Sequence, residues 1–197
     1  LSVMLNGYYT QWMDKSVTKA IGSWNGPRAC IPNIDARHMG IELEASYQPL
    51  EWLRVYGFFT IGNWRWTNDV NFTLFNELNE KIGEYHAYIK NLHVGNAPQT
   101  SAMLGLSCMP VSGLTLGVDF NYYGRHYADF AAADRTDEKD RAEAWKLPDY
   151  STVDLNLNYD FKMGTFQGQL FGNVNNLFNR KYISDALDGS DHTRETA

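Results

Sequence analysis

Apolar and polar residues alternate along much of the chain, with the period of two that a half-buried β-strand produces. The clearest run is 150–161, where Val153 and Leu155 share one face and Asp154 lies on the other. Similar runs recur, although 51–66 is apolar on both faces and its orientation stays open. The predicted strands are 1–15, 38–48, 51–66, 99–109, 114–124, 150–161 and 166–176.

The links between these strands alternate between long and short. The long links are 16–37, 67–98 and 125–149, and the short links are 49–50, 110–113 and 162–165. Compact soluble domains rarely carry several structureless loops of such length, whereas outer-membrane barrels combine long extracellular loops with short periplasmic turns. A half-buried sheet in a soluble protein explains the strand alternation as well, but it does not explain the links. The pattern predicts an all-β fold, a fragment of an antiparallel transmembrane β-barrel with about seven strands.

Aromatic residues make up 14% of the chain and gather at the ends of the predicted strands. If the first strand runs outward, one set marks the outer ends and another the inner ends. The outer set is Tyr8, Tyr9, Trp12, Trp64, Trp66, Tyr122, Tyr123 and Tyr150, and the inner set is Tyr47, Trp52, Tyr159, Phe161 and Phe166. These sets predict aromatic girdles at the two membrane interfaces. The other explanation is that strands attract aromatic residues in general.

Charge and composition narrow the class further. With 17 basic and 23 acidic residues, the formal net charge of −6 does not suit a protein that tracks nucleic-acid phosphates. The chain has no apolar run of roughly 18 residues, which excludes a transmembrane helix but not a barrel. Cys30 falls in an outer loop and Cys108 near the opposite rim. Because a disulfide spans at most ~7 Å between Cα atoms, both are predicted to be free thiols.

One stretch near the end of the chain is specific enough to indicate a family. It reads GNVNNLFNRKY at 172–182 and resembles the NLFN(K/R)(K/E)Y stretch near the C-terminus of TonB-dependent receptors. Four further stretches fit the same family in the same order, namely YYTQWMDK at 8–15, GIELEA at 40–45, NAP at 96–98 and LPDYSTVD at 147–154. The resemblance covers nearly the whole chain. Its character is Bacteroidetes-like and siderophore-type rather than SusC-type.

The resemblance implies a complete barrel of about 22 strands with an N-terminal plug domain inside it. The domain prediction is therefore one unit over 1–197, the C-terminal part of a TonB-dependent receptor barrel, with the plug domain and the last strand absent. An odd strand number agrees with a fragment, because bacterial single-chain barrels have even numbers and each strand edge needs a partner.

The resemblance also implies a function, which is active import of a scarce nutrient such as siderophore-bound iron, haem or cobalamin across the bacterial outer membrane. The implied partners are outer-membrane lipid, the small-molecule nutrient, and the TonB–ExbB–ExbD complex reached through the missing N-terminal region. No cofactor, nucleic acid or enzymatic activity is expected. A passive porin or structural outer-membrane barrel and a soluble carbohydrate-binding β-sandwich remain the alternatives.

Aromatic and cationic residues at the predicted outer mouth are the candidates for ligand capture, because rings stack and arginine donates charged hydrogen bonds. They are Trp24, Arg28, Trp64, Arg65, Trp66, His86, His93, Arg125, His126 and Tyr127. Packing in loops and at the interface is an equally open interpretation. No histidine has a convincing metal-binding spacing, so solvated loop histidines and no metal are expected. Glu42 and Glu44 are expected to line a wet lumen rather than to act in catalysis.

Within the family stretch a structural role is expected for Asn175, Asn176, Leu177, Phe178, Asn179 and Tyr182. The asparagines can cap free backbone groups through Asx-type turns where the strand leaves the sheet. The apolar and aromatic side chains are expected to anchor the following loop on the rim.

Overall fold

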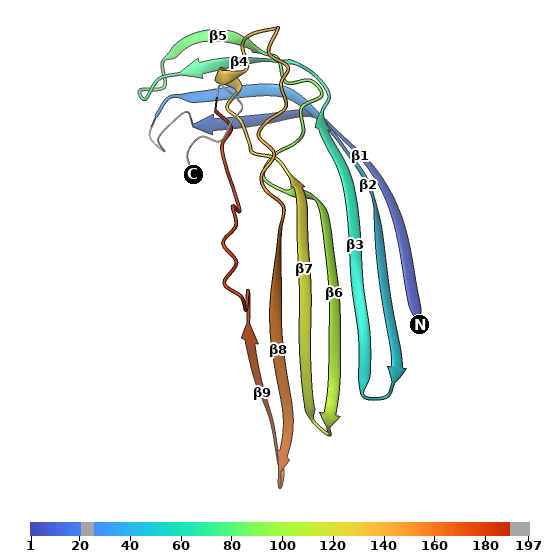
Figure 1. The fold of residues 1–197 in the computed structure, drawn as a ribbon. Coiled ribbons are helices and arrows are strands. Elements are labelled where there is room, and N and C mark those ends of the chain that lie inside the picture. The colour runs from blue at the N-terminus through green and yellow to red at the C-terminus, as the bar shows by residue number, and fades with distance from the viewer. Residues whose placement is uncertain (21–25, 190–197) are drawn as a thin grey trace.

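The computed structural model describes residues 1–20 and 26–189, which form one tall, curved antiparallel sheet (Figure 1). Its strands are β1 (Ser2–Ala20), β2 (Arg28–Leu50), β3 (Leu53–Trp66), β4 (Val70–Phe75), β5 (Lys81–Ala87), β6 (Pro98–Val111), β7 (Leu114–His126), β8 (Tyr150–Met163) and β9 (Phe166–Val174). A single-turn 3-10 helix, Ala132–Asp134, lies in the link after β7. Within these described ranges no helix is long and apolar enough to cross a membrane.

Seven of the nine strands follow one another across the sheet in the order β1-β2-β3-β6-β7-β8-β9. They coincide with the seven predicted strands, so the predicted antiparallel barrel fragment is confirmed. The short turns lie at the lower end in Figure 1 and the long links at the upper end. The upper end of β2 also pairs with β4, which forms a hairpin with β5.

The long links contain more strand than the sequence indicated. β1 and β2 remain paired to their upper ends, so most of the predicted link 16–37 is strand. The sequence did not predict this part of the strands because β-bulges interrupt the alternation of apolar and polar residues. The register shifts on both sides of Lys15, and Asp14 and Asn33 each have a φ of 55°. The β4–β5 hairpin inside 67–98 was also missed, since its strands of six and seven residues are too short to show a clear alternation.

The register fixes which side chains share a face, because directly opposed residues on neighbouring strands point the same way. One apolar row crosses five strands and consists of Leu5, Leu43, Phe59, Ala102 and Tyr122. The row settles the orientation of β3, which the sequence left open. Phe59 and Ile61 join the apolar face, whereas Tyr56 and Thr60 lie on the polar face.

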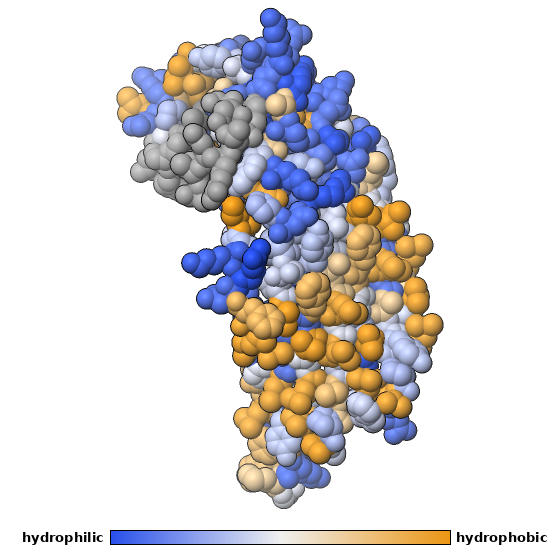
Figure 2. Space-filling model, viewed as in Figure 1, coloured by the Kyte–Doolittle hydropathy of each residue, from blue (hydrophilic) through white to orange (hydrophobic). Residues whose placement is uncertain are grey.

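The apolar face of the sheet is uncovered. Leu104 is 60% exposed and Phe120 is 48% exposed. Figure 2 shows apolar side chains gathered over the lower part of the molecule, with polar side chains above them. A continuous apolar band of this kind is the lipid-facing surface of a barrel. A soluble sandwich would bury it against a second sheet, but all described strands belong to one sheet, so the β-sandwich alternative is wrong.

The aromatic residues form one of the two predicted girdles better than the other. Tyr47, Tyr159 and Phe166 lie on the apolar face near the lower turns, as an inner girdle requires. At the upper end only Tyr9 and Tyr122 of the outer set share that face. The other members point to the polar face, namely Tyr8, Trp12, Trp64, Trp66, Tyr123 and Tyr150, so a lipid-facing outer girdle is wrong for them.

The upper part of the molecule, here called the cap, comprises residues 26–35, 67–97, 127–149 and 177–189. Its core joins β2, β4 and β5 to the link after β7 and consists of Ala29, Ile31, Ile34, Val70, Phe72, Ala87, Ile89, Leu92, Phe130, Ala132 and Ala144. Arg135 and Asp188 form a fully buried ion pair of 2.7 Å within the cap. Lys19 of β1 pairs with Asp129, which ties the first strand to this layer.

The two cysteines lie at opposite ends of the sheet and both are free. Cys30 was expected in a loop but belongs to β2, where its sulfur lies 3.6 Å from the Thr18 hydroxyl. Cys108 lies near the lower end of β6, opposite Leu53 and Leu116.

Candidate functional site

The polar face of the sheet carries a network of side-chain hydrogen bonds. Tyr56 donates its hydroxyl to Asp119 at 2.7 Å, and Asn156 donates to the other oxygen of the same carboxylate at 3.0 Å. Asn121 donates to Asp154 at 2.8 Å. A face of this chemistry, opposite a lipid-facing band, is the wall of a water-filled lumen.

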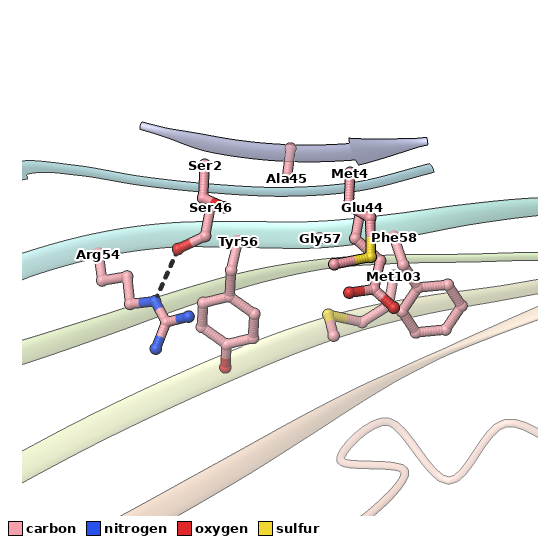
Figure 3. A pocket seen from close by; sticks show the side chains of 10 residues that line it. All are labelled: Ser2, Met4, Glu44, Ala45, Ser46, Arg54, Tyr56, Gly57, Phe58 and Met103. Carbon is pink, nitrogen blue, oxygen red and sulfur yellow. Dashed lines mark hydrogen bonds between the residues drawn. The ribbon is translucent and has the colours of Figure 1, made fainter. Parts of the chain in front are cut away.

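A hollow of about 430 Å³ lies against the lower part of this wall. Figure 3 shows Arg54, Tyr56, Phe58 and Met103 beside it, with Arg54 donating to the Ser46 hydroxyl at 2.9 Å. Its lining mixes charge, sulfur and aromatic rings, and Glu44 faces the same hollow. Glu44 lies on the polar face of β2, where a residue that lines the lumen is expected.

Four rings meet on the polar face, halfway along β1 and β2 and near the upper end of β3. This aromatic cluster consists of Tyr8, Trp12, His38 and Trp64. The Trp12 indole donates to His38 Nδ1 at 3.0 Å, and the Trp64 indole donates to the Tyr8 hydroxyl at 2.8 Å. The ring centroids of His38 and Trp64 lie 5.3 Å apart, and Lys15 Nζ lies 4.6 Å above the Trp12 ring. The cluster is a hydrogen-bonded aromatic surface at the mouth of the lumen, with one cation beside it.

Two glycines make room for this cluster. A Cβ at Gly40 would lie 2.6 Å from the Tyr8 hydroxyl, and a Cβ at Gly62 would lie 2.7 Å from the Trp64 indole nitrogen. Both glycines are on the polar face and oppose each other in register. The Tyr8 and Trp64 side chains therefore lie flat over bare backbone, a close approach that no larger residue allows.

The structure places the predicted ligand candidates at the mouth of the lumen, in or beside the cap, and on the outer face of the sheet. Trp64 belongs to the aromatic cluster, and Arg125 lies behind it, donating to the Gly62 carbonyl at 2.8 Å. Trp66 shares the face of Trp64 but packs against the core of the cap. Trp24 lies outside the described residues.

The remaining candidates belong to the cap or the outer face. Arg28 bonds to Asn79 in the β4–β5 hairpin, and His86 bonds to Asn71 at 2.7 Å on the same hairpin. Arg65 shares the apolar-face row of β3, directly opposite Arg37, and is held by the Asn91 carbonyl and Glu143. Its strand position directs it away from the lumen, contrary to the expectation that it lines the mouth.

Two histidines are buried where solvated loop residues were expected. His93 and His126 are each 4% exposed, so the expectation of solvation is wrong for both. His93 stacks on Tyr127 with centroids 3.9 Å apart, and its Nδ1 lies 2.6 Å from Glu143. Burial lowers the pKa of His93 from 6.5, and the nearby Glu143 carboxylate opposes that shift. Burial also lowers the pKa of His126, against the effect of Asp185.

Among the described residues no group of three or more histidine, cysteine or acidic side chains could hold a metal ion. The sequence did not predict that Tyr8, Trp12, Lys15 and His38 lie together in one site. Their one visible signal is the spacing of Tyr8 and Trp12, which places both on one face of a strand. Grouping them with His38 and Trp64 requires the register of three strands.

The family stretch forms a turn where the sheet ends after β9. Asn176 has a φ of 51°, accepts the Arg180 amide at 2.8 Å and donates to the Arg180 carbonyl at 2.9 Å. Tyr182 stacks on Tyr150 with centroids 4.1 Å apart. Phe178 is 74% exposed, so it does not pack against the described rim as expected, whereas Leu177 is 41% exposed and therefore partly covered. Asn175 and Asn179 flank the turn, and Asn179 also has a positive φ of 49°.

The fold and its two faces define a segment of an outer-membrane β-barrel. The family model described as TonB dependent receptor-like, beta-barrel, matches residues 1–177. The chain therefore belongs to the TonB-dependent receptor β-barrel family, which places it in the bacterial outer membrane.

One curated relative is the ferrichrome outer membrane transporter/phage receptor of Escherichia coli (strain K12), which is 32% identical over 80 residues. That stretch covers 40% of this chain and 9% of the relative. The match thus spans a small part of a much longer protein.

Proposed function

We propose that the chain is the C-terminal part of a barrel that imports a scarce nutrient with energy supplied through TonB. The observation that carries the proposal is the family match over 1–177. A polar wall that carries an aromatic cluster at its upper, extracellular end supports it, because a transporter needs capture groups where the lumen opens. The energy would come from the TonB–ExbB–ExbD complex acting on an N-terminal region and a plug domain of the receptor.

The proposed nutrient is an iron chelate of the siderophore type, with haem and cobalamin as the other candidates. The name of the Escherichia coli relative, a ferrichrome transporter, supports this choice. The capture residues proposed for it are Trp64 and Arg125 at the mouth. Those in the cap are Arg28, His86, His93 and Tyr127, and His126 ends β7 directly below it. His93 and His126 would need the cap to move because both are buried.

Uptake by cells that carry the full-length receptor tests this proposal. Radiolabelled iron is supplied as ferrichrome, as ferric citrate and as haem to matched strains with and without TonB. Uptake of at least one chelate is expected to require both the receptor and TonB, and to stop when an uncoupler removes the proton-motive force. Uptake that persists without TonB would contradict the proposal.

A passive porin shares the barrel but not the energy requirement. Conductance of the full-length protein in planar bilayers separates the two, since a receptor closed by a plug is expected to show no stable open channel. A steady conductance at low voltage would favour the porin instead.

A further inference from the structure

The hydrogen bonds inside the aromatic cluster leave it with donors and few acceptors. His38 Nδ1 accepts the Trp12 indole hydrogen, so the ring is neutral and carries its own hydrogen on Nε2. That Nε2 is covered and has no partner among the described residues. The Tyr8 oxygen accepts from Trp64, which leaves the Tyr8 hydrogen free to be donated. The Tyr8 hydroxyl therefore offers a hydrogen to a group that lies against it, whereas the hydrogen on His38 Nε2 is covered.

Lys15 adds a positive charge to these donors. Its Nζ lies over the Trp12 ring, and none of the ion pairs found in the described part of the chain involves it. The neighbouring acidic residues are Asp14, next to Lys15 in the chain, and Asp35, next to its register partner Ile34. The Asp35 carboxylate accepts the Asp14 backbone amide at 2.8 Å. A cation on an aromatic face beside a free hydroxyl donor favours an anionic acceptor.

The rings themselves favour a flat partner. Trp12 is 45% exposed, so its face is accessible from the lumen side. Aromatic faces gain most from offset stacking on another planar group. The Lys15 charge lies beside the stacking surface, because its Nζ is 4.6 Å from the centre of the Trp12 ring.

We propose that Tyr8, Trp12, Lys15 and His38 form a binding site for a planar ring that carries an anionic oxygen group. The ring stacks on Trp12, and the oxygen accepts hydrogen bonds from Tyr8 and from Lys15. This inference rests on the proposed import function in one respect, because the ligand of the site would be the imported nutrient.

The test uses the purified full-length receptor and two iron(III) complexes of similar size as probes. The tris-catecholate complex is anionic and built from rings, whereas the tris-acetohydroxamate complex is neutral and has none. Equilibrium dialysis with radiolabelled iron measures the affinity of each. The catecholate complex is expected to bind at least tenfold more tightly, and added salt is expected to weaken it. Equal affinity for the two complexes would overturn the proposal.

Two matched pairs of variants locate the binding. Tyr8→Phe removes a hydroxyl from the lumen face, and Tyr9→Phe removes one from the lipid face of the same strand. Lys15→Gln removes a charge beside the cluster, and Arg37→Gln removes one from the opposite face of β2. The first member of each pair is expected to weaken catecholate binding roughly tenfold, since each removes a hydrogen bond to a charged group. The second member is expected to leave it unchanged.

The variants also separate this inference from the proposed function. Dialysis needs neither TonB nor a membrane potential, so failed uptake with intact, Tyr8-dependent binding would contradict only the transport proposal. The opposite result would contradict only this site. In that case uptake of a chelate still depends on TonB, but neither the uptake nor the affinity measured by dialysis changes in Tyr8→Phe and Lys15→Gln. A heat-resistant folded band in gel electrophoresis confirms that each variant is a folded barrel before it is used.

Discussion

At the scale of single residues, the aromatic cluster depends on two missing side chains. A Cβ at Gly62 would lie 2.7 Å from the Trp64 indole nitrogen and 3.1 Å from the Tyr8 hydroxyl. Gly62→Ala is therefore expected to break the hydrogen bond between these rings and to cost about 1 kcal/mol of stability. Near-UV circular dichroism of the full-length receptor should show a loss of aromatic signal. Gly7→Ala is the control, because its Cβ meets nothing within 4 Å, and an unchanged spectrum for both would contradict the geometry.

The buried histidines make the cap sensitive to pH. Burial lowers the pKa of His93 and of His126 from 6.5, so at mildly acidic pH the opened cap binds protons that the closed cap does not. The cap is therefore most stable above pH 6.5 and loses stability as the pH falls below that value. Limited proteolysis of the link 127–149 is expected to speed up between pH 7.5 and 5.5. His93→Gln should weaken that dependence, whereas an identical profile in the variant would rule out His93 as its source.

At the scale of an element, the turn after β9 rests on one asparagine. Asn176 has a positive φ of 51°, and its side-chain amide makes two hydrogen bonds to the backbone of Arg180. Its backbone N–H donates to the Asp154 carboxylate at 2.7 Å. Asn176→Ala is expected to cost roughly 1–3 kcal/mol, because both side-chain bonds are lost and alanine disfavours this φ. Asn176→Gly should cost less, since glycine accepts the backbone angle. Urea unfolding in detergent measures both, and equal losses would show that φ does not matter here.

Elements were predictable where their alternation is unbroken. The run 150–161 keeps a strict period of two and is found as β8 (Tyr150–Met163). The upper half of β2 was not predictable, because Asn33 adds a residue with positive φ and shifts the apolar side chains out of phase. The same limit applies to the aromatic cluster. Its members lie on strands whose register depends on bulges that no local pattern reveals.

At the scale of the whole molecule, the two faces of the sheet should respond differently to the same charge. Leu104 and Met103 are adjacent on β6 and point to opposite faces, Leu104 with Phe120 and Met103 with Asn121. Leu104→Lys is expected to cost about 2–4 kcal/mol of stability in a bilayer, because it places a charge in lipid. Met103→Lys enters the wet lumen and should cost much less. Folding of both variants into lipid vesicles, followed by heat-modifiable mobility, checks the difference. Similar losses would mean that the faces are assigned wrongly.

The overall architecture could be predicted because it is encoded in the lengths of the links as well as in the strands. The short links 110–113 and 162–165 correspond to tight turns at Gly113 and Gly164, which have φ angles of 85° and 61°. The cap could not be predicted, since its stability comes from contacts between segments far apart in the chain. Arg135 and Asp188, for example, are 53 residues apart and meet only because the links after β7 and β9 pack together.

The length of β2 decides what an approaching macromolecule meets above the membrane. Arg37 lies about ten residues above Tyr47, which is the span a strand needs to cross the bilayer, and β2 continues to Arg28. At about 3.3 Å per residue, those last nine residues are roughly 30 Å of strand, and in Figure 1 the upper parts of β1 and β2 bend sideways beneath β4 and β5. The β4–β5 hairpin, with the highly exposed Leu78 at its tip, therefore lies outside the membrane, where we expect an antibody to reach it. The aromatic cluster lies below this layer, nearer the membrane.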